Sequence, residues 1–514
     1  MPDWLKNAVF YEIYPQSFYD SDGDGIGDLN GIIKKLPYVK SLGCNAIWLN
    51  PCFDSPFKDA GYDVRDYKKV SARYGTNQDL INCFQEAHKI GMRIILDLVP
   101  GHTSDQHDWF THSQKAQSNV YSDRYIWTDS VWNAPNEFRF ITGASERNGA
   151  YLVNFFSSQP ALNYGFNCVT APWQMPYTHP RIKQTRDAII DIMRFWLEKG
   201  CDGFRVDMAD SLVKNDEDKS ATMHVWQQLF SEIKPEFPQA AFISEWCYPE
   251  RALSCGFHGD FYLDHENNGY HALFRKRDPK TGQPMSFFSQ KGTGDITAFT
   301  HEYKEKYLSS KDKGYFCFIT CNHDTPRLTR DYSFKEMVLS YAFIFTMPGV
   351  PFLYYGDEIG MKYNADLISK EGGYQRTGTR TPMQWEPGQN LGFSKAAREK
   401  LYLPVDENLD AATVESQEGN PDSLLNHVRR LIKLRLDHPD LQADGDFEII
   451  YAHKNKVPFV YQRGRYLLAV NPSLQEVTIS LNQVGEIIFQ IGDYKLNNGK
   501  LRMSAQSFLV LEIK

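Results

Sequence analysis

One order of apolar and polar positions recurs along most of the chain: an amphipathic helix, then a glycine, then a short apolar strand. From Asp28 onward, apolar residues at positions 32, 33, 36, 39 and 42 follow helical spacing, Gly43 ends the helix, and residues 46–49 form a predicted strand. Glycine just past a helix is a common stop signal. Alternation of helices with strands that are apolar throughout is typical of parallel strands covered by helices.

This unit repeats often enough to predict a closed barrel. Helices that begin near Thr76 and Thr185 end at Gly91 and Gly200, and each leads into a further apolar run. The eight predicted strands lie at residues 9–14, 46–49, 93–98, 203–206, 241–244, 261–263, 316–320 and 350–354. Eight such strands predict an α/β fold of the (β/α)8, or TIM-barrel, type.

Two stretches depart from this rhythm. Residues 102–180 are rich in Ser, Asn, Trp and Tyr and lack helical periodicity, so we expect an inserted domain B after the third strand. Later, short strands at 447–451, 458–462, 466–470, 476–480, 486–490 and 507–513 predict a C-terminal antiparallel β-sandwich. The predicted domains are the barrel at 1–101, the insertion at 102–180, the barrel again at 181–437 and the sandwich at 438–514.

Composition narrows the classes of function. The net charge is −8 over 514 residues with no run of like charge, which predicts no nucleic-acid partner. The nine cysteines are odd in number and show no paired metal-ligand spacing, so we expect reduced thiols. Residues 1–14 lack a signal-peptide pattern, and no apolar run approaches the ~20 residues of a membrane span. We therefore expect a cytoplasmic protein without a membrane partner, and the sequence predicts no oligomeric state.

Four short segments at predicted strand ends hold the candidate chemistry. They contain Asp97 and His102, Arg205 and Asp207, Glu245, and His323 and Asp324. Residues from several strand ends of a (β/α)8 barrel converge on one face. Carboxylates flanked by imidazoles, without a cofactor fingerprint, are typical of glycosidic-bond cleavage.

Asp207 and Glu245 suit the two carboxyl groups of a retaining glycosidase, which lie about 5–5.5 Å apart. Arg205 stands two residues before Asp207, hence on the same side of the strand, where a guanidinium keeps a nucleophilic carboxylate ionised. Ile243 and Trp246 give Glu245 apolar neighbours, which suits a general acid. Taken singly, either acid could belong to an ordinary ion pair; the whole set in this order favours chemistry.

These segments resemble the four signature regions of the α-amylase superfamily, glycoside hydrolase family thirteen, and the resemblance covers essentially the whole chain. Residues 159–163 and 380–385 (Gln-Pro-Ala-Leu-Asn and Arg-Thr-Pro-Met-Gln-Trp) resemble markers of its oligo-1,6-glucosidase and α-glucosidase branch, with Ala161 where an acid is usual. The resemblance implies Asp207 as nucleophile, Glu245 as acid/base and Asp324 as transition-state stabiliser. It also implies that Asp97, His102, Arg205 and His323 line the site.

The segment at residues 59–63 (Asp-Ala-Gly-Tyr-Asp) extends the resemblance. In enzymes of this branch, an Asp and a Tyr at the matching places hold the non-reducing terminal glucose. Carried over, Asp59 binds the distal hydroxyls, Tyr62 stacks under the ring, and Arg327 joins them. A pocket blocked at that end is exo-acting. The alternative is an ordinary polar loop after the second strand.

An acidic loop near the N-terminus has metal-ligand spacing. Asp20, Asp22, Asp24, Gly25 and Asp28 match positions one, three, five, six and nine of a calcium loop, but Gly31 stands where an EF-hand has its bidentate Glu. The resembling enzymes imply one structural Ca²⁺ or Mg²⁺, held by the four acids and the Ile26 carbonyl. No cofactor is expected in catalysis. The alternative is an Asp/Gly turn that binds no metal.

The substrate is the least constrained prediction. In this branch a Val after the nucleophile goes with α-1,6 bonds and Ala or Thr with α-1,4 bonds, whereas this chain has Met208, whose flexible thioether could narrow the next subsite. Because the Val is absent, we expect an exo-acting α-glucosidase for short α-1,4-linked oligosaccharides. The alternatives are an oligo-1,6-glucosidase acting on isomaltose-type substrates and a glucosyl transferase or isomerase like trehalose synthase. A more remote alternative is a non-catalytic homologue with a binding role.

Overall fold

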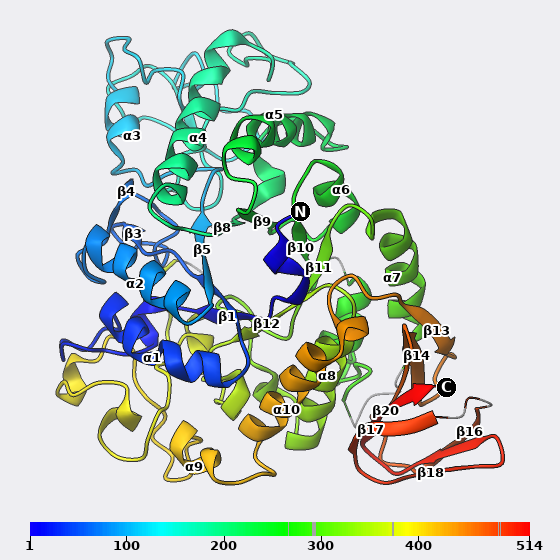
Figure 1. Ribbon diagram of the computed structural model, residues 1–514. Coiled ribbons are helices and arrows are strands. Elements are labelled where there is room, and N and C mark those ends of the chain that lie inside the picture. Colours follow the sequence, from blue (N-terminus) through cyan, green and yellow to red (C-terminus); the bar gives the residue numbers. More distant parts are fainter. Residues whose placement is uncertain (266, 290–294, 373–374, 482, 484, 514) are drawn as a thin grey trace.

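A closed barrel of parallel strands forms the centre of the molecule (Figure 1). The structure, a computed structural model, describes residues 1–513 except 266, 290–294, 373–374, 482 and 484. The barrel strands are β1 (Phe10–Ile13), β2 (Ala46–Leu49), β5 (Arg93–Leu98), β8 (Gly203–Val206), β9 (Ala241–Ser244), β10 (Gly259–Phe261), β11 (Tyr315–Ile319) and β12 (Val350–Tyr354). Each pairs in parallel with its neighbours, and β1 closes the ring against β12. The predicted (β/α)8 barrel is confirmed.

Helices surround the barrel because their apolar faces cover the outside of the strands. They are α1 (Leu29–Ser41), α2 (Asn77–Lys89), α4 (Lys183–Leu197), α5 (Ser220–Glu236), α6 (Pro249–Ser254), α7 (Thr297–Ser310), α8 (Phe334–Thr346) and α10 (Leu424–Asp437). The Asp28 side chain caps α1, and Thr76 and Asp79 form a capping box at α2. Gly43 and Gly91 follow these helices with φ of 96° and 70°, as expected of glycine stops. Among the described residues, no helix is both long and apolar enough to cross a membrane.

The sixth barrel strand differs from its prediction. Residues 261–263 were expected, whereas β10 begins two residues earlier, at Gly259. Its central residue, Asp260, is fully buried. A buried carboxylate interrupts the apolar run by which the other strands are recognised, and this explains the displaced prediction.

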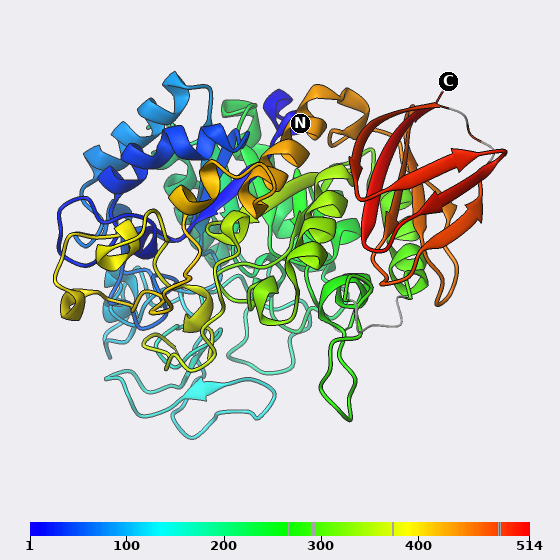
Figure 2. The same ribbon diagram turned by 90° about the horizontal axis from the view of Figure 1, so that it is seen from below.

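A long insertion separates β5 from α4. It contains α3 (Asp108–Ser113) and the short strands β6 (Phe140–Ile141) and β7 (Tyr151–Leu152), which pair antiparallel. Figure 2 shows this segment in cyan on one side of the barrel. A second small antiparallel pair, β3 (Phe53–Asp54) with β4 (Asp66–Val70), follows β2. It brackets the loop that carries Asp59 and Tyr62.

Two antiparallel sheets form the C-terminal part, shown in orange and red in Figure 2. The larger contains β13 (Glu448–Tyr451), β14 (Phe459–Arg463), β15 (Tyr466–Asn471), β20 (Ser507–Ile513) and β17 (Gly485–Ile491). The smaller contains β16 (Val477–Ser480), β19 (Lys500–Met503) and β18 (Tyr494–Asn497). Apolar side chains of both sheets share one buried cluster. The antiparallel sheets expected at the C-terminus are confirmed, with β18 and β19 as strands that the sequence analysis missed.

Candidate active site

The side chains from the four segments meet at the carboxyl ends of the barrel strands. Asp97 lies in β5 and Arg205 in β8, at paired positions of the two strands. Asp207 and Glu245 directly follow β8 and β9, and His323 and Asp324 follow β11. Loops at this end of a (β/α)8 barrel form the active site in characterised enzymes of the fold.

One guanidinium group holds three of the acids together. Arg205 Nη1 lies 2.9 Å from Asp97 Oδ1 and 3.0 Å from Asp207 Oδ1, and its Nη2 lies 2.7 Å from Glu245 Oε2. We call these four residues the Arg205 cluster. Because Asp207 and Glu245 bind the same guanidinium, the structure brings together the two acids that the sequence analysis paired.

Exposure distinguishes the acids of the site. The side chains of Asp97 and Arg205 are 0% and 1% exposed, whereas those of Asp207 and Glu245 are 11% and 24% exposed. Asp324 is 32% exposed. The three acids with predicted catalytic roles are therefore the ones that solvent reaches, while Asp97 and Arg205 lie behind them.

Burial opposes ionisation of Asp207. Desolvation raises its pKa well above the ordinary value, Glu245 and Asp97 raise it further, and the Arg205 guanidinium lowers it. The prediction that Arg205 keeps Asp207 ionised thus identifies only one of the opposing effects. Three carboxylates around one guanidinium favour retention of a proton within the Arg205 cluster.

Asp260 fixes the chain on both sides of Glu245. Its Oδ1 accepts hydrogen bonds from Ser244 Oγ at 2.6 Å and from the Trp246 backbone N–H at 3.0 Å. The next residue, Cys247, has a left-handed backbone with φ of 65°. A buried carboxylate therefore stabilises the turn that presents Glu245, and the sequence analysis did not identify it.

A buried histidine links Asp324 to the Arg205 cluster. His323 Nε2 lies 3.3 Å from Asp324 Oδ2 and 2.7 Å from the Tyr62 hydroxyl, which donates to Asp97 Oδ2 at 2.9 Å. Burial lowers the pKa of His323, but Asp324 and Glu12 outweigh this effect and raise it to about 9. For Asp324, burial raises the pKa, while His323 and Arg376 bring it well below its ordinary value. Asp324 is thus an anion and His323 a cation at neutral pH.

Two arginines that the sequence analysis did not assign to the site bind its acids. Arg376 pairs with Asp59 and lies 3.0 Å from Asp324 Oδ1, and Arg380 Nη2 lies 2.6 Å from the same oxygen. Gln159 donates to Asp59 Oδ2 at 2.7 Å. Arg380 and Gln159 belong to the two branch markers, so a signal for them existed in the sequence. Arg376 lies outside both markers, and the sequence analysis held no signal for it.

Arg327, which was predicted to join Asp59 and Tyr62 in binding substrate, makes its contacts elsewhere. Its side chain is fully buried, and Nη1 donates to Asp357 Oδ1 and to the Tyr355 carbonyl, both at 2.8 Å. Its Nη2 donates to the Thr379 carbonyl at 3.1 Å. Arg327 therefore ties the loops after β11 and β12 together, and Arg376 occupies the place beside Asp59 that was predicted for it.

His102 and Tyr62 lie next to the cluster, with their polar atoms already bound. His102 Nε2 lies 3.1 Å from the Tyr62 carbonyl, and Nδ1 lies 3.2 Å from Asn154 Nδ2. Burial lowers the pKa of His102 to about 4, so the ring is neutral. The Tyr62 ring is 5.3 Å from that of His323 and nearly parallel to it. The sugar contacts of His102 and Tyr62 remain predictions.

The residue after Asp207 has an unusual backbone. Met208 adopts a left-handed conformation with φ of 42°, and its N–H donates to Glu245 Oε2 at 3.1 Å. The turn after β8 thereby connects the two acids through the backbone as well as through Arg205. An effect of the Met208 side chain on linkage preference remains a prediction.

The acidic N-terminal loop brings together part of its predicted ligand set. Carboxylate oxygens of Asp20, Asp22 and Asp28 lie within 4.8 Å of one another. Asp24 is not in this group, and its Oδ1 accepts a hydrogen bond from the Ile26 N–H at 2.8 Å. Burial raises the pKa of Asp22, and the neighbouring acids raise it further. Clustered carboxylate oxygens that repel one another fit a hard divalent cation.

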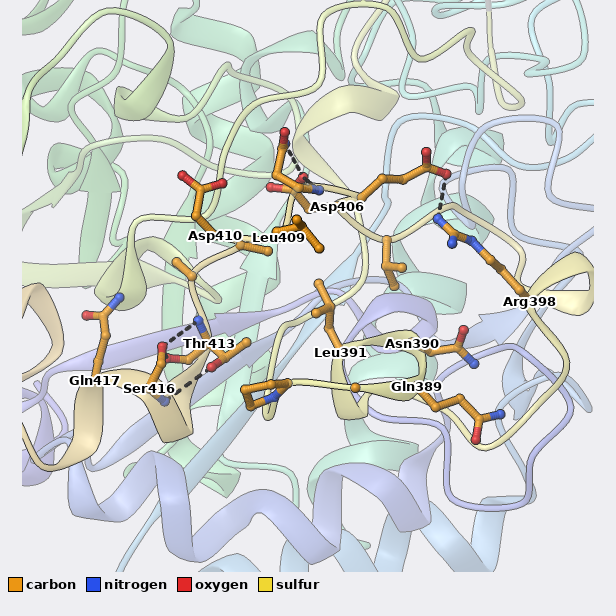
Figure 3. Close-up of a pocket in the computed structure, with 17 residues that line it drawn as sticks. Gln389, Asn390, Leu391, Arg398, Asp406, Leu409, Asp410, Thr413, Ser416 and Gln417 are labelled. Atoms are coloured by element: carbon orange, nitrogen blue, oxygen red, sulfur yellow. Dashed lines mark hydrogen bonds and ion pairs between the residues drawn. The ribbon is translucent and has the colours of Figure 1, made fainter.

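A separate hollow of about 960 Å³ lies in the segment between Pro387 and Gln417 (Figure 3). Arg398 and Glu407, which form an ion pair, both line it, and Thr413 and Ser416, which form a capping box, line it as well. Its lining contains none of the predicted site residues. We therefore assign it no part in the chemistry of the Arg205 cluster.

Comparison with known proteins gives a consistent family. Residues 12–444 match the family model described as "Alpha amylase, catalytic domain". The chain is 33% identical to a trehalose synthase/amylase of Mycolicibacterium smegmatis over 87% of this chain and 78% of that protein. It is 32% identical to an oligo-1,6-glucosidase of Heyndrickxia coagulans over 94% of each. The crystal structure of an isomaltulose synthase from Protaminobacter rubrum superposes along the full length of both chains with a TM-score of 0.83 and 26% identity.

Proposed function

Because the chain belongs to the α-amylase family of glycoside hydrolases, we propose that it is a retaining, exo-acting α-glucosidase that releases glucose from the non-reducing end of short α-glucosides. The observation that carries this proposal is the Arg205 cluster, in which Asp207 and Glu245 bind one guanidinium and both reach solvent. Two carboxyl groups facing a common space are what a double displacement at a glycosidic carbon requires.

The two acids divide the proposed reaction between them. In the first step Glu245 gives its proton to the glycosidic oxygen, the bond from C1 to that oxygen breaks, and an Asp207 oxygen bonds to C1. In the second step water attacks C1, passes a proton to Glu245, and Asp207 leaves. This division of roles requires the proton on Glu245 and the negative charge on Asp207 when the glycosidic bond breaks. Arg205 stabilises that charge from behind.

Asp324 serves the transition state in this account. Positive charge develops on the sugar ring as the glycosidic bond breaks, and the low pKa of Asp324 keeps a carboxylate available to oppose it. The cation at His323 lies 3.3 Å from Asp324 Oδ2 and fixes the orientation of the carboxylate. Fixed charges near a developing charge are a large source of catalysis.

The exo mode rests on the residues around Asp59. Arg376 joins Asp59 to Asp324, and the Gly372 N–H donates to the Lys58 carbonyl at 2.7 Å, so the segment after β12 closes over this end of the site. A sugar bound between Asp59 and the Arg205 cluster would have its distal hydroxyls facing this closed end. An exo-acting enzyme requires a site that is closed in this way beyond the terminal glucose residue.

The linkage is tested by product analysis. We propose α-1,4-linked oligosaccharides because the residue after Asp207 is Met208 rather than Val. Purified protein is incubated with maltose, isomaltose, trehalose and sucrose in separate reactions, and the products are separated by chromatography. Glucose from maltose and not from isomaltose is the expected result. Glucose mainly from isomaltose would assign the chain to the oligo-1,6-glucosidases, and the turnover of none would contradict the proposed function.

A second candidate is a glucosyl transferase or isomerase. It is favoured by the 33% identity to a trehalose synthase/amylase and by the superposition on an isomaltulose synthase. The same acids would form the glucosyl intermediate, and exclusion of water would let a sugar hydroxyl attack it in place of water. New disaccharides in the product analysis, from maltose or sucrose, would favour this candidate over hydrolysis.

Removal of Arg376 is expected to weaken substrate binding. An Arg376→Leu variant leaves Asp59 and Asp324 without a shared cation, and a lost charged hydrogen bond is worth about 1.5–3 kcal/mol. We expect kcat/KM to fall by about 10- to 100-fold, mostly through KM. Steady-state kinetics with the preferred disaccharide measures it. The control is Arg330→Leu, because Arg330 pairs with Asp331 at a more exposed place. An effect on kcat alone would contradict a binding role.

We further propose that the acidic loop holds one structural Ca²⁺, with Mg²⁺ as the alternative. Asp20, Asp22 and Asp28 supply the carboxylate oxygens, and the Ile26 carbonyl completes the proposed set. The loop is joined to the rest of the molecule by a hydrogen bond from Ser394 Oγ to Asp20 Oδ2 at 2.5 Å. A cation here would stabilise the loop and would take no part in the reaction.

Chelation is expected to lower the melting temperature by about 3 °C or more, because only the folded loop gathers the acids. The change in rate at low temperature is expected to be smaller. Asp22→Asn is the matched variant, since Asp22 is the exposed member of the group. With Ca²⁺ present this variant should melt below the wild type. With chelator the order should reverse, because the repulsion between acids is relieved. An unchanged melting temperature on chelation, with no bound metal by elemental analysis, would remove the cation from the account.

A further inference from the structure

Glu12 is a buried acid inside the barrel that the proposed reaction does not use. It lies in β1, paired with Trp48 of β2 and Tyr354 of β12, and is 0% exposed. Its Oε1 lies 2.7 Å from His323 Nδ1. Its Oε2 has no hydrogen-bond partner in the described part of the chain. A buried carboxylate is costly unless it is paired, and here the pairing is with His323.

A continuous chain of polar contacts leads from Glu12 to the Arg205 cluster. His323 Nε2 lies 2.7 Å from the Tyr62 hydroxyl, the Tyr62 hydroxyl lies 2.9 Å from Asp97 Oδ2, and Asp97 Oδ1 lies 2.9 Å from Arg205 Nη1. Each of these distances is short enough for a hydrogen bond. Through these contacts, the protonation state of His323 affects the hydrogen bonds of Asp97 and Arg205, and Arg205 binds Asp207 and Glu245.

The direction of the hydrogen bonds depends on the charge of the ring. With both ring nitrogens protonated, Nδ1–H donates to Glu12, Nε2–H donates to the Tyr62 oxygen, and the Tyr62 O–H donates to Asp97. With a proton on Nδ1 alone, Nε2 becomes an acceptor, and the Tyr62 O–H donates its hydrogen bond to Nε2 instead of to Asp97. Asp97 then loses a donor and competes more strongly for Arg205, which also holds Asp207 and Glu245.

We propose that Glu12 is a positioning residue, which keeps the His323 side chain doubly protonated and thereby directs the Tyr62 hydroxyl towards Asp97. Glu12 contacts no reacting atom and acts through His323. The proposal rests on the proposed function in one respect: the catalytic consequence requires that the Arg205 cluster carries the reaction. The pairing of Glu12 with His323 stands on its geometry.

The surroundings of His323 favour the charged ring. Burial lowers the pKa of His323, but Asp324 and Glu12 raise it to about 9. Arg380 opposes them from the backbone side, where its Nε donates to the His323 carbonyl at 2.8 Å. Further groups that face the ring or act on its charge are Asp97, Tyr62, Tyr14, Trp48 and Asn50.

The change that tests the proposal is Glu12→Gln, which keeps the shape and the acceptor oxygen but removes the charge. Histidine labelled with ¹³C at Cε1 reports protonation by NMR, and a His323→Gln variant assigns the signal. In the wild type we expect His323 to titrate near pH 9. In Glu12→Gln we expect it to titrate about one pH unit or more lower. The alkaline limb of kcat/KM is expected to move in the same direction.

Glu358→Gln is the matched control. Glu358 is also fully buried, and it accepts hydrogen bonds from the Tyr11 and Tyr38 hydroxyls, both at 2.7 Å, without contacting His323. The Glu358→Gln substitution removes one carboxylate from a buried site near β1, as Glu12→Gln does. We expect the His323 titration to stay as in the wild type. A Glu12→Asp variant keeps the charge at a longer distance and should titrate between the wild type and Glu12→Gln.

Two results would overturn the proposal. One is a His323 titration in Glu12→Gln that equals that of the wild type. The other is a His323 titration in Glu12→Asp that lies at or below that in Glu12→Gln. If Glu12→Gln fails to fold, Glu12→Asp is compared with the wild type, and an equal His323 titration in the two proteins would overturn the proposal. The NMR titration of His323 does not depend on catalysis. A protein without glycosidase activity would contradict the proposed function, but the effect of Glu12 on the His323 titration could still be measured.

Discussion

An Asp207→Asn variant is expected to turn over short α-glucosides about 10⁴- to 10⁶-fold more slowly than the wild type, the scale seen when a nucleophile is removed. The amide carries no charge to attack C1 and forms no glycosyl ester. The loss should lie in kcat and in kcat/KM together, because the missing bond is made only after substrate binds. Steady-state kinetics with the disaccharide that the wild type prefers measures it.

The same substitution is expected to raise the melting temperature. Burial raises the pKa of Asp207 well above its ordinary value, Glu245 and Asp97 add to this, and Arg205 opposes it. An acid whose pKa rises on folding destabilises the folded state once the pH exceeds its unfolded pKa. Asn removes that cost, so the gain should be largest near about pH 7 and should shrink towards about pH 4. Thermal unfolding across that range tests the sign.

Asp202→Asn is the matched control for both effects. Asp202 directly precedes β8, at the end of the strand opposite Asp207, and pairs with His88 at 2.7 Å and Arg93 at 2.9 Å. This end of a barrel serves stability rather than chemistry. We expect a lower melting temperature and a nearly unchanged rate. Near-normal turnover by the Asp207→Asn variant would exclude Asp207 as the nucleophile.

Glu245→Gln is expected to lower the rate on a disaccharide by about 10²- to 10⁴-fold, the usual contribution of a general acid or base. The loss on 4-nitrophenyl α-glucoside should be smaller, because that leaving group departs without a proton. Comparison of kcat/KM for the two substrates isolates the acid step. Azide, which attacks without a general base, should restore turnover of the activated substrate.

Glu250→Gln is the control for Glu245→Gln. Glu250 lies in α6, is 34% exposed and pairs with Lys306 at 3.7 Å. We expect near-normal rates on both substrates. Equal losses on the disaccharide and the activated glucoside in Glu245→Gln, with no response to azide, would mean that Glu245 is not the proton donor.

The barrel could be predicted because parallel strands buried on both faces read as short apolar runs. Five strands, β2, β5, β8, β9 and β12, have the bounds expected from the sequence. The bounds of β1 and β11 differ from the prediction by one residue at each end. The larger difference is at β10, which contains the buried Asp260, and the contacts of Asp260 are to the neighbouring strand and the turn after it. Such a residue looks like a surface position until the tertiary structure is known.

The missed strands β18 and β19 had a local signal. They are joined by Asn498 and Gly499, both with positive φ, and Asn-Gly is a favoured hairpin turn. In both strands exposed residues alternate with less exposed ones, and Lys495 and Arg502 are among the exposed residues. The weak apolar content of these strands concealed them from a search for apolar runs.

Some residues of the candidate site could be predicted from the sequence and others could not. Asp207, Glu245 and Asp324 were found because they follow strand ends, a position that sequence order reveals. Glu12 and Arg376 act across more than 300 residues of chain, from β1 to His323 and from the segment after β12 to Asp59. The Arg327 side chain lies against Asp357 and the Tyr355 carbonyl, because closeness to Asp324 in the sequence does not fix the direction of a long side chain.

The central claim, that Asp207 forms a covalent bond to the sugar, is tested most directly by trapping. The protein is incubated with 5-fluoro-α-D-glucosyl fluoride, which forms the glycosyl ester faster than the ester hydrolyses, and intact mass and peptide mapping follow. We predict one adduct per chain on the peptide that contains Asp207, and none in Asp207→Asn. An adduct on another acid, or turnover of the reagent with inversion at C1, would contradict the account.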